Sequence, residues 1–568
     1  MIIDARNLPR GATINGSICI VGGGAAGITL AKELSDRFTD IILLESGGMN
    51  LEADTQDLYK GEILDPNHGA LEEQRQRRLG GTTNVWGGRC APFDELDFQS
   101  RSHVPHSGWG ISRQDLDPFY QQAHDYCDLG RYAYDVKQAL GVDAPVMIPG
   151  WDAPEITTDK LWLFSPPTNF KTKYRDWLKQ TTKVTTYIHA NCLKIITNAD
   201  GNIIDYLECA SLSKNYFTVR AHSYILAMGC LEITRLLLLS RDTHQQGIGN
   251  QHDLVGRYYM GHISGDVGKV KFTPKQGKVI WDYEKTQDGV YARRAIALSP
   301  QTQKEHQLLN FRAILHYPEM SEPTHGNGIL SAMYLVKSLL LLRQTSRIYY
   351  SKNLDTSQLH TTWIAHFQNI VQNLDKLGVF AYKWLTQRLL SDRQLPSVVL
   401  GSQSNTYTLH FDAEQTPNYN SRIMLGDELD SFGLNRLKVD WRYTDQDIQN
   451  VIDSYQIIAQ TLQVTEAGEL EFTAEQMPEL IKQNLGVGSH HIGTTRMANH
   501  PQSGVVDCNC QVHGINNLYI ASSSVFPTSS YANPTLTIVA IAIRLAAHFK
   551  QLAFHPTNLD NSVLPINH

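Results

Sequence analysis

The chain has 568 residues, of which 42% are hydrophobic and 19% are charged. This length exceeds that of a typical domain, so we expect two domains with a sizeable buried core. The formal net charge is -7, which leaves no basic footprint of the kind that binds nucleic acids or acidic membranes. Composition therefore argues against those partners and favours a small molecule.

The N-terminal residues do not resemble a secretory signal, because charges at Asp4, Arg6 and Arg10 interrupt any apolar run. The eight cysteines show no spacing typical of a zinc site or a disulfide framework. The most apolar helix candidate, residues 335–342, is far shorter than the roughly 20 residues that a membrane span needs. We expect a cytoplasmic protein with reduced thiols, no metal site and no transmembrane segment.

The first predicted elements are a strand, a glycine turn and a helix. Residues 17–22 read Ser-Ile-Cys-Ile-Val-Gly, which is typical of a short buried strand, and residues 27–34 continue at helical spacing. A second apolar run, 41–44, ends at Glu45. This order is typical of the β-α-β unit of a parallel sheet.

The turn of that unit fits the pattern G-x-G-x-x-G at Gly22, Gly24 and Gly27. In such a turn the first glycine bends the chain, the second lets a pyrophosphate approach the backbone, and the third lets the helix pack on the strand. Glu45 stands where a carboxylate accepts ribose hydroxyl groups. The unit therefore predicts a dinucleotide site, but it does not distinguish NAD from FAD.

The pattern of elements changes about halfway along the chain. Alternating segments at 183–205 favour further strands of the first sheet, whereas later alternating segments flank a helical block at about 330–395. We predict an α/β fold with a Rossmann-like, parallel-sheet domain built from both chain ends, 1–264 and 481–568. We expect an α+β domain with a mostly antiparallel sheet, 265–480, to bind the substrate.

Two further segments favour FAD. Residues 78–88, Arg-Leu-Gly-Gly-Thr-Thr-Asn-Val-Trp-Gly-Gly, contain two glycine pairs whose backbone can press against a flat ring and a phosphate. Near the C-terminus a helix opens at Asn533-Pro534, where proline is tolerated because its missing donor would have been unpaired. The positive end of that helix can stabilise the anion that forms when a flavin is reduced.

A candidate base occurs in residues 489–497, Ser-His-His-Ile-Gly-Thr-Thr-Arg-Met. A histidine in a polar, glycine-flanked loop can take the proton of an alcohol near neutral pH while a nearby amide binds the same oxygen. Spacing alone does not separate His490 from His491. His262 is a further histidine for which a place in the site and a structural role are both open.

Together these segments resemble the glucose-methanol-choline (GMC) family of FAD oxidoreductases, in the branch of pyranose oxidase, cholesterol oxidase and gluconate-type dehydrogenases. The similar segments are 21–27 with Glu45, 79–88, 227–238 and 489–537. The family pattern H-x-x-G-T falls on His490 to Thr494, and the second catalytic position of the family falls on Asn533. The resemblance implies that His490 is the base and that Asn533 orients the alcohol.

The resemblance also implies noncovalent FAD, because Val85 stands where some relatives carry a histidine bonded to the flavin. Ser522 stands where many relatives carry an aspartate, so one flavin hydrogen bond is in doubt. Asn84 either lies along the dinucleotide or caps its own loop. The implied cofactor-binding residues are Gly22, Gly24, Ala25, Ala26, Gly27, Glu45, Ser46, Gly80, Gly81, Thr82, Asn84, Val85, Cys192, Ala227, Gly229, Ser522, Ser523, Pro534 and Thr535.

The expected reaction is oxidation of a CH-OH group to a carbonyl by hydride transfer to the flavin. A sugar, polyol or glycoside is the leading substrate class, and a sterol, lipid or secondary-metabolite alcohol is the alternative. A non-redox flavin lyase, a protein with structural FAD and an NAD dehydrogenase are rival functions. The sequence leaves open the oligomeric state and whether oxygen, a quinone or a redox protein accepts the electrons.

Overall fold

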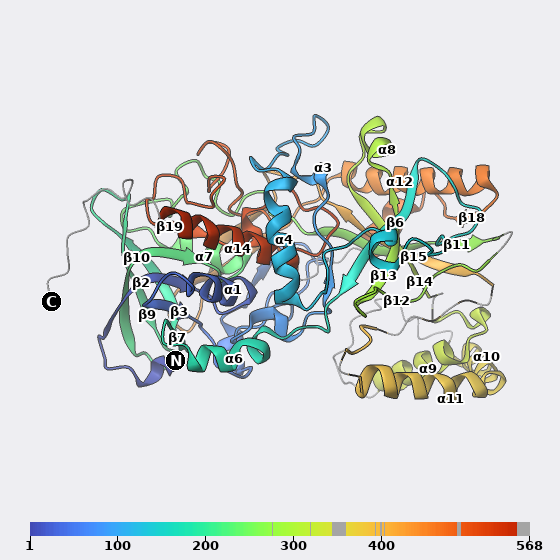
Figure 1. Ribbon diagram of the computed structural model, residues 1–568, viewed down its shortest axis with the longest axis horizontal. Coiled ribbons are helices and arrows are strands. Elements are labelled where there is room, and N and C mark those ends of the chain that lie inside the picture. Colours follow the sequence, from blue (N-terminus) through green and yellow to red (C-terminus); the bar gives the residue numbers. More distant parts are fainter. Residues whose placement is uncertain are drawn as a thin grey trace.

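Two large sheets stand side by side, each covered by helices, in the computed structural model of the chain (Figure 1). The structure describes residues 1–553 except 275–276, 318–319, 343–358, 392, 398–399, 401, 403 and 485–489. The first residue of the histidine motif, Ser489, therefore lies outside the described residues. Buried apolar side chains form two clusters, one centred on each sheet.

The first sheet has the strand order β1-β7-β3-β2-β10-β9-β8, and β19 pairs with β10. Its strands are β1 (Ile2–Asp4), β2 (Thr13–Val21), β3 (Ile41–Leu44), β7 (Val184–Ile188), β8 (Asn191–Thr197), β9 (Ile204–Ala210), β10 (Tyr216–Leu226) and β19 (Leu518–Ile520). All neighbouring pairs are parallel except those made by β9, which are antiparallel. Because β19 comes from the C-terminal end, the predicted Rossmann-like sheet built from both chain ends is confirmed.

Helices α1 (Ala25–Leu34), α14 (Thr535–Leu552) and α4 (Arg113–Cys127) pack next to one another beside this sheet (Figure 1). Among the described residues, α14 is the one helix that is long and apolar enough to span a membrane, and just over half of it is buried. An apolar helix is stable in water when its apolar face is covered. Packing against α1 and α4 therefore accounts for the composition of α14.

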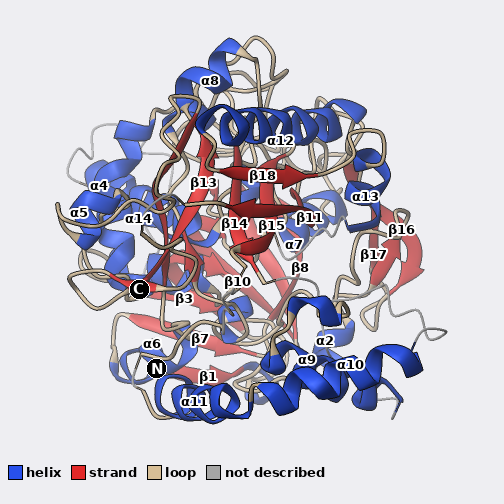
Figure 2. Ribbon diagram, turned by 90° about the vertical axis from the view of Figure 1, so that its right-hand side faces the viewer, coloured by secondary structure: helices blue, strands red, loops and turns tan. Residues whose placement is uncertain are grey.

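The second sheet is mostly antiparallel and has the order β18-β11-β15-β14-β13-β6-β5, with β12 paired to β13. Its strands are β5 (Arg89–Cys90), β6 (Ile156–Phe164), β11 (His262–Phe272), β12 (Glu284–Lys285), β13 (Tyr291–Leu298), β14 (Phe311–His316), β15 (Thr406–Glu414) and β18 (Gly468–Glu471). Helix α12 (Asp445–Thr465) covers one face, where the Tyr455 hydroxyl donates to the Val267 carbonyl at 2.8 Å (Figure 2).

The boundary between the two sheets is more interleaved than the sequence predicts. Strands β5 and β6 lie within the segment expected to form the first domain, yet they pair with each other and β6 pairs with β13 of the second sheet. The partners β6 and β13 are far apart in the sequence, so local pattern does not reveal which sheet a strand joins. A small third sheet likewise combines β4 (Gly61–Ile63) with β16 (Arg422–Leu429) and β17 (Asn435–Asp440).

The expected helical block consists of α9 (Gly328–Leu342), α10 (Leu359–Gln372) and α11 (Leu374–Trp384), followed by a π-helical turn at Leu385–Leu389. These helices stand apart at the lower edge of the molecule, on the opposite side of the second sheet from α12 (Figures 1 and 2). The remaining helices are α2 (Ala53–Asp57), α3 (Glu95–Phe98), α5 (Val136–Leu140), α6 (Phe170–Gln180), α7 (Cys230–Leu239), α8 (Pro300–Glu305) and α13 (Met477–Asn484).

Candidate active site

In the turn after β2, a different steric reason explains each of the three glycines. Gly22 has a φ of +111°, and a Cβ atom there would lie 2.6 Å from the Ala227 carbonyl oxygen. A Cβ on Gly27 would lie 1.8 Å from the Gly22 carbonyl oxygen, so only glycine lets α1 approach β2. A Cβ on Gly24 would lie 4.0 Å from its nearest neighbour, the Cα of Gly81. The backbone at Gly24 is therefore open to a ligand.

Glu45 directly follows β3, beside this turn. Its two carboxylate oxygens accept hydrogen bonds from the backbone N–H of Gly23 at 2.9 Å and of Gly47 at 2.7 Å. The side chain is buried, and burial raises its pKa above the ordinary value, although the bonds from Gly47 and Gly23 oppose that shift. The carboxylate is thus held rigidly at the edge of the cavity, where ribose hydroxyls can donate to it.

A cavity of about 620 Å³ extends from the glycine turn to His490. The first turn of α1 has no side-chain cap at Gly24, so its backbone N–H groups are available to an anion. The predicted site residues that line the cavity are Gly22, Gly24, Ala25, Ala26, Glu45, Ser46, Gly81, Thr82, Val85, Ala227, Gly229, His490, Ser522, Ser523, Asn533, Pro534 and Thr535. An open phosphate cradle, a ribose acceptor and a helix N-terminus at the far end fit a flavin dinucleotide.

Four predicted residues take other places. Gly27 packs α1 on β2, as its spacing predicts, and Gly80 adopts a φ of +88° where the loop enters a short helical turn. The Asn84 amide donates to the carbonyls of Leu79 at 3.0 Å and of Gly81 at 2.7 Å, so it caps its own loop. Cys192 lines a smaller neighbouring cavity.

His490 lies at the centre of a chain of three polar side chains. Its Nε2 atom is 2.9 Å from the Asn533 amide nitrogen, and its Nδ1 atom is 3.1 Å from Nδ1 of His262. His262 Nε2 is in turn 3.2 Å from the Ser529 carbonyl oxygen, which can only accept. His262 therefore donates through Nε2 and accepts through Nδ1, and His490 donates through Nδ1. This assignment leaves the lone pair of His490 on Nε2, where it faces Asn533.

Burial first, then the proximity of His262 and Arg89, lowers the pKa of His490 to about 3. Burial also lowers the pKa of His262. Both imidazoles are therefore neutral at physiological pH, which agrees with the tautomers deduced from the hydrogen bonds. A neutral imidazole with a free lone pair can accept a proton from an alcohol.

Backbone pairing on two sides fixes the position of His490. The N–H and carbonyl groups of Ile492 pair with those of Met260 at 3.0 Å in both directions, which ties this segment to the start of β11. On the other side, the Gly493 N–H donates to the Ser523 carbonyl at 3.1 Å. Gly493 has a φ of +93°, and a Cβ there would lie 2.5 Å from the Tyr258 carbonyl oxygen. The glycine of the H-x-x-G-T pattern is thus required by close packing.

Arg89 and Asp412 are site residues that sequence reasoning missed. Arg89 Nε donates to Asn533 Oδ1 at 2.8 Å, which turns the amide nitrogen of Asn533 toward His490. The Arg89 guanidinium also forms an ion pair with Asp412 at 2.8 Å. Burial alone would raise the pKa of Asp412, but Arg89 and then His410 lower it to about 2. The only sequence signal for Arg89 is its position directly after the glycine loop.

His491 has a packing role that distinguishes it from its neighbour. Its ring stacks with the rings of His68 and Tyr259, with centroid distances of 6.0 Å and 6.1 Å. Burial, followed by the positive charge of Arg75, lowers its pKa well below the ordinary value. Both histidines line the cavity, but His490 is the one in contact with Asn533.

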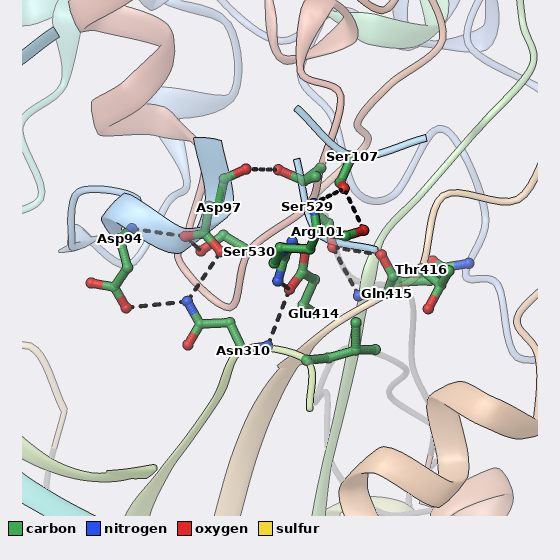
Figure 3. Close-up of polar contacts among 12 residues, drawn as sticks. Asp94, Asp97, Arg101, Ser107, Asn310, Glu414, Gln415, Thr416, Ser529 and Ser530 are labelled. Atoms are coloured by element: carbon green, nitrogen blue, oxygen red, sulfur yellow. Dashed lines mark hydrogen bonds and ion pairs between the residues drawn. The ribbon is translucent and has the colours of Figure 1, made fainter. Parts of the chain in front are cut away.

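A buried polar network holds the segment that leads to Asn533 (Figure 3). The Ser530 hydroxyl donates to Asp97 at 2.7 Å, and the Asn310 amide donates to the same carboxylate at 3.1 Å. Arg101 forms a buried ion pair with Glu414 at the end of β15, and one of its bonds is 2.8 Å long. The network therefore fixes residues preceding Asn533 to both α3 and the second sheet.

A second polar cluster lies on the face of β11 that carries His262, because alternate residues of a strand share a face. The carboxylate of Asp266 accepts from Nδ1 of His316 at 2.9 Å and from Nδ1 of His410 at 3.2 Å. The three ligand atoms lie within 4.8 Å of one another, a spacing that a metal ion could bridge. The hydrogen bonds pair all three side chains without an ion.

Known proteins match this chain at both sequence and fold level. Residues 417–542 match the family model described as GMC oxidoreductase. Paromamine 6'-oxidase of Streptomyces fradiae is 28% identical over 93% of this chain and 90% of its own length. The 6'''-hydroxyparomomycin C oxidase of Streptomyces lividus is 29% identical over 22% of each chain.

The fold of the whole chain is similar to that of pyridoxine 4-oxidase from "Mesorbium loti", with a TM-score of 0.53, 16% identity, and coverage of 94% of this chain and 99% of that one. The family match includes Asn533 and His490, which the fold brings together at the end of a dinucleotide cradle. Residues 417–542 thus form a GMC oxidoreductase domain, and the site as a whole is consistent with FAD-dependent oxidation of an alcohol.

Proposed function

We propose that the protein oxidises a CH-OH group of a sugar, polyol or glycoside to a carbonyl, with noncovalent FAD as its cofactor. The observation that carries the proposal is the 2.9 Å contact between His490 and Asn533 in a cavity that begins at the glycine turn. Similarity to two oxidases named for paromamine and hydroxyparomomycin supports a carbohydrate substrate. Val85 lines the cavity and has no nucleophilic atom, which supports noncovalent attachment.

His490 and Asn533 divide the work on the hydroxyl group. The Nε2 lone pair of His490 accepts the hydroxyl proton, and the Asn533 amide donates to the same oxygen in place of its present bond to His490. The bond from Arg89 holds the amide in the orientation that this requires. FAD, when bound, supplies the acceptor for the hydride that leaves the carbon.

Replacing each of the two adjacent histidines tests the proposal. We expect His490→Ala to retain FAD and to lower the single-turnover rate of flavin reduction by about 10²- to 10⁴-fold, the contribution of a positioned base. His491→Phe is the matched control, because a phenyl ring keeps the stacking with His68 and Tyr259. We expect this variant to stay within a few-fold of the wild-type rate.

The substrate class is tested by anaerobic bleaching of the flavin with a panel of sugars, polyols and sterols. Bleaching by sugars or polyols is the expected result. Bleaching by sterols alone would contradict the carbohydrate assignment, and no bleaching by any alcohol would favour a lyase or structural FAD. A wild-type rate in His490→Ala would show that His490 is not the base.

A further inference from the structure

The loop of residues 528–533 carries both ends of the polar chain that runs through His490. At one end of the loop, the Asn533 amide nitrogen lies 2.9 Å from Nε2 of His490. Near the other end, the Ser529 carbonyl oxygen lies 3.2 Å from Nε2 of His262. The two histidines meet at 3.1 Å through their Nδ1 atoms. The Ser529 carbonyl therefore decides which nitrogen of His262 carries the proton, and thereby which nitrogen of His490 keeps its lone pair.

Asp97 of α3 binds this loop on both sides of Ser529. The Ser530 hydroxyl donates to the Asp97 carboxylate at 2.7 Å (Figure 3). The Thr528 hydroxyl donates to the backbone carbonyl of Asp97 at 2.8 Å. Asp97 and the three loop residues are each 0% exposed. Water does not readily replace a lost bond at so buried a site, so a change in Asp97 has to be taken up by the loop.

The backbone of Ser530 makes the Ser529 carbonyl sensitive to the bond with Asp97. Ser530 has a φ of +55°, a left-handed conformation that residues with a Cβ atom seldom adopt. Such a conformation persists where the surrounding contacts impose it. The Ser529 carbonyl and the Ser530 nitrogen share one peptide plane, so relaxation of this φ would turn the carbonyl away from His262. The side-chain bond from Ser530 to Asp97 thus helps to hold the carbonyl in place.

The bond from Ser530 depends on the charge of Asp97. The carboxylate accepts three hydrogen bonds, from the Ser530 hydroxyl, from the Asp94 N–H at 2.7 Å and from the Asn310 amide at 3.1 Å. An ionised carboxylate can accept all three, because it has acceptor sites only, whereas a protonated carboxyl group has a donor of its own. The Ser530 hydroxyl is the one donor of the three that can rotate. Protonation of Asp97 therefore reverses or removes this bond.

The surroundings of Asp97 place this change in the neutral pH range. The charged and titratable groups around it are Asp94, Arg101, Tyr120, Arg312, Glu414 and Tyr531. Burial first, then the charges of Glu414 and Asp94, raises the pKa of Asp97 to about 7, and Arg101 opposes this shift. The pKa of His490 is lowered to about 3. An ionisation near pH 7 that controls the rate would therefore not belong to the base itself.

We propose that Asp97 is a positioning residue, which holds the Ser529 carbonyl in place and thereby keeps His490 in the tautomer that accepts a proton. This inference rests on the proposed oxidation of an alcohol. When Asp97 is ionised, the loop holds the carbonyl against His262. When Asp97 is protonated, the bond from Ser530 is lost and the carbonyl can turn. The rate of flavin reduction should therefore follow the ionisation of a residue outside the active-site cavity.

The pH dependence of anaerobic flavin reduction tests the proposal. The substrate is the sugar or polyol that bleaches the flavin of the FAD-loaded wild type fastest. We expect the wild-type rate to rise at least about tenfold with pH, through one ionisation near pH 7. Asp97→Asn cannot ionise, so its rate should be independent of pH in this range. That rate should stay at least about tenfold below the wild-type plateau.

Ser530→Ala removes the same bond from the side of the loop. Its rate of flavin reduction should fall to a level similar to that of Asp97→Asn. The double variant D97N/S530A should be no slower than the slower single variant, because both changes act through one bond. Losses that add in the double variant would show two independent structural effects and would overturn the proposal.

Asp115→Asn is the matched control for the loss of a helix cap. Asp115 is the third residue of α4 and belongs to a capping box, as Asp97 does in α3. Its carboxylate accepts from the Ser112 N–H at 2.7 Å, which is the counterpart of the bond from the Asp94 N–H. We expect this variant to keep the wild-type rate and its fall at low pH. Urea denaturation of every variant checks that it is folded over the pH range used.

Infrared difference spectroscopy between the wild type and Asp97→Asn follows the same proton without a substrate. The carbonyl band of a protonated carboxylic acid should disappear from the wild type as the pH rises through about 7. A band that does not titrate near neutral pH would overturn the proposal, and so would an Asp97→Asn variant with the wild-type rate and pH profile. Failure of the proposed function looks different: the wild-type flavin is not bleached by any sugar or polyol, or His490→Ala reduces it at the wild-type rate.

Discussion

Arg89 should control activity by holding the Asn533 amide, and Arg89→Leu tests this. The change removes the 2.8 Å bond to Asn533 and the ion pair with Asp412, whose side chain is only 4% exposed. Leaving a buried charge without its partner costs about 3–5 kcal/mol. The Ser264 hydroxyl still donates to Asp412 at 2.9 Å, so we expect the unfolding free energy to fall by about 3 kcal/mol, the lower end of this range.

The double variant R89L/D412N separates stability from positioning. It removes the unpaired charge, so most of the unfolding free energy should return, as measured by urea denaturation. It does not restore the bond that orients Asn533, so flavin reduction should stay roughly 10- to 100-fold slow, which corresponds to about 1.4–2.7 kcal/mol of barrier.

The single variant Asp412→Asn provides the control, because it keeps Arg89 beside Asn533. We expect it to reduce its flavin faster than the double variant does. A double variant that reduces flavin at the wild-type rate would refute the positioning role of Arg89. The rates are measured anaerobically in a stopped-flow instrument after the FAD content of each variant has been matched.

Two further predictions concern the cofactor cradle and acid stability. Gly24→Ala should fold but bind FAD at least about tenfold more weakly. Gly27→Ala should fail to fold, because its Cβ would collide with the Gly22 carbonyl. Gly426→Ala is the control, because a Cβ there has its nearest contact at 3.5 Å. Equal FAD affinity in Gly24→Ala and the control would contradict the cradle. The pKa of His490 is lowered to about 3 in the folded protein, from 6.5 in the unfolded chain. The contribution of His490 to the unfolding free energy is therefore complete above pH 6.5 and is lost as the pH falls toward 3. His490→Gln should therefore flatten the fall in unfolding free energy between pH 6 and pH 4 by up to about 1.4 kcal/mol per pH unit, and an unchanged slope would contradict the lowered pKa.

The glycine turn could be predicted from sequence because its reasons are local. Gly22, Gly24 and Gly27 act on the backbone within one β-α-β unit, and the structure gives each a separate steric role. His490 and Asn533 were assigned through a resemblance that covers their motifs, and residue pattern alone left His490 and His491 equivalent. Their different surroundings become visible only in three dimensions.

Arg89, His262 and Asp412 show where sequence reasoning ends. Each reaches the site through contacts with residues far away in the chain, as in the bond from Arg89 to Asn533. Such contacts depend on which strands become neighbours, and β5 joins the second sheet although its sequence lies within the first half of the chain. Strand pairing over such distances has no local signature.

The cavity uses residues from both ends of the chain, and this sets a time order for its assembly during synthesis. Gly24 of the phosphate cradle leaves the ribosome long before Asn533 and Thr535, which line the same cavity. Chains of this size commonly fold in stages as they emerge. The cofactor therefore cannot be fully enclosed before Asn533 has emerged, so FAD supply should affect the yield of folded enzyme rather than the rate of its synthesis.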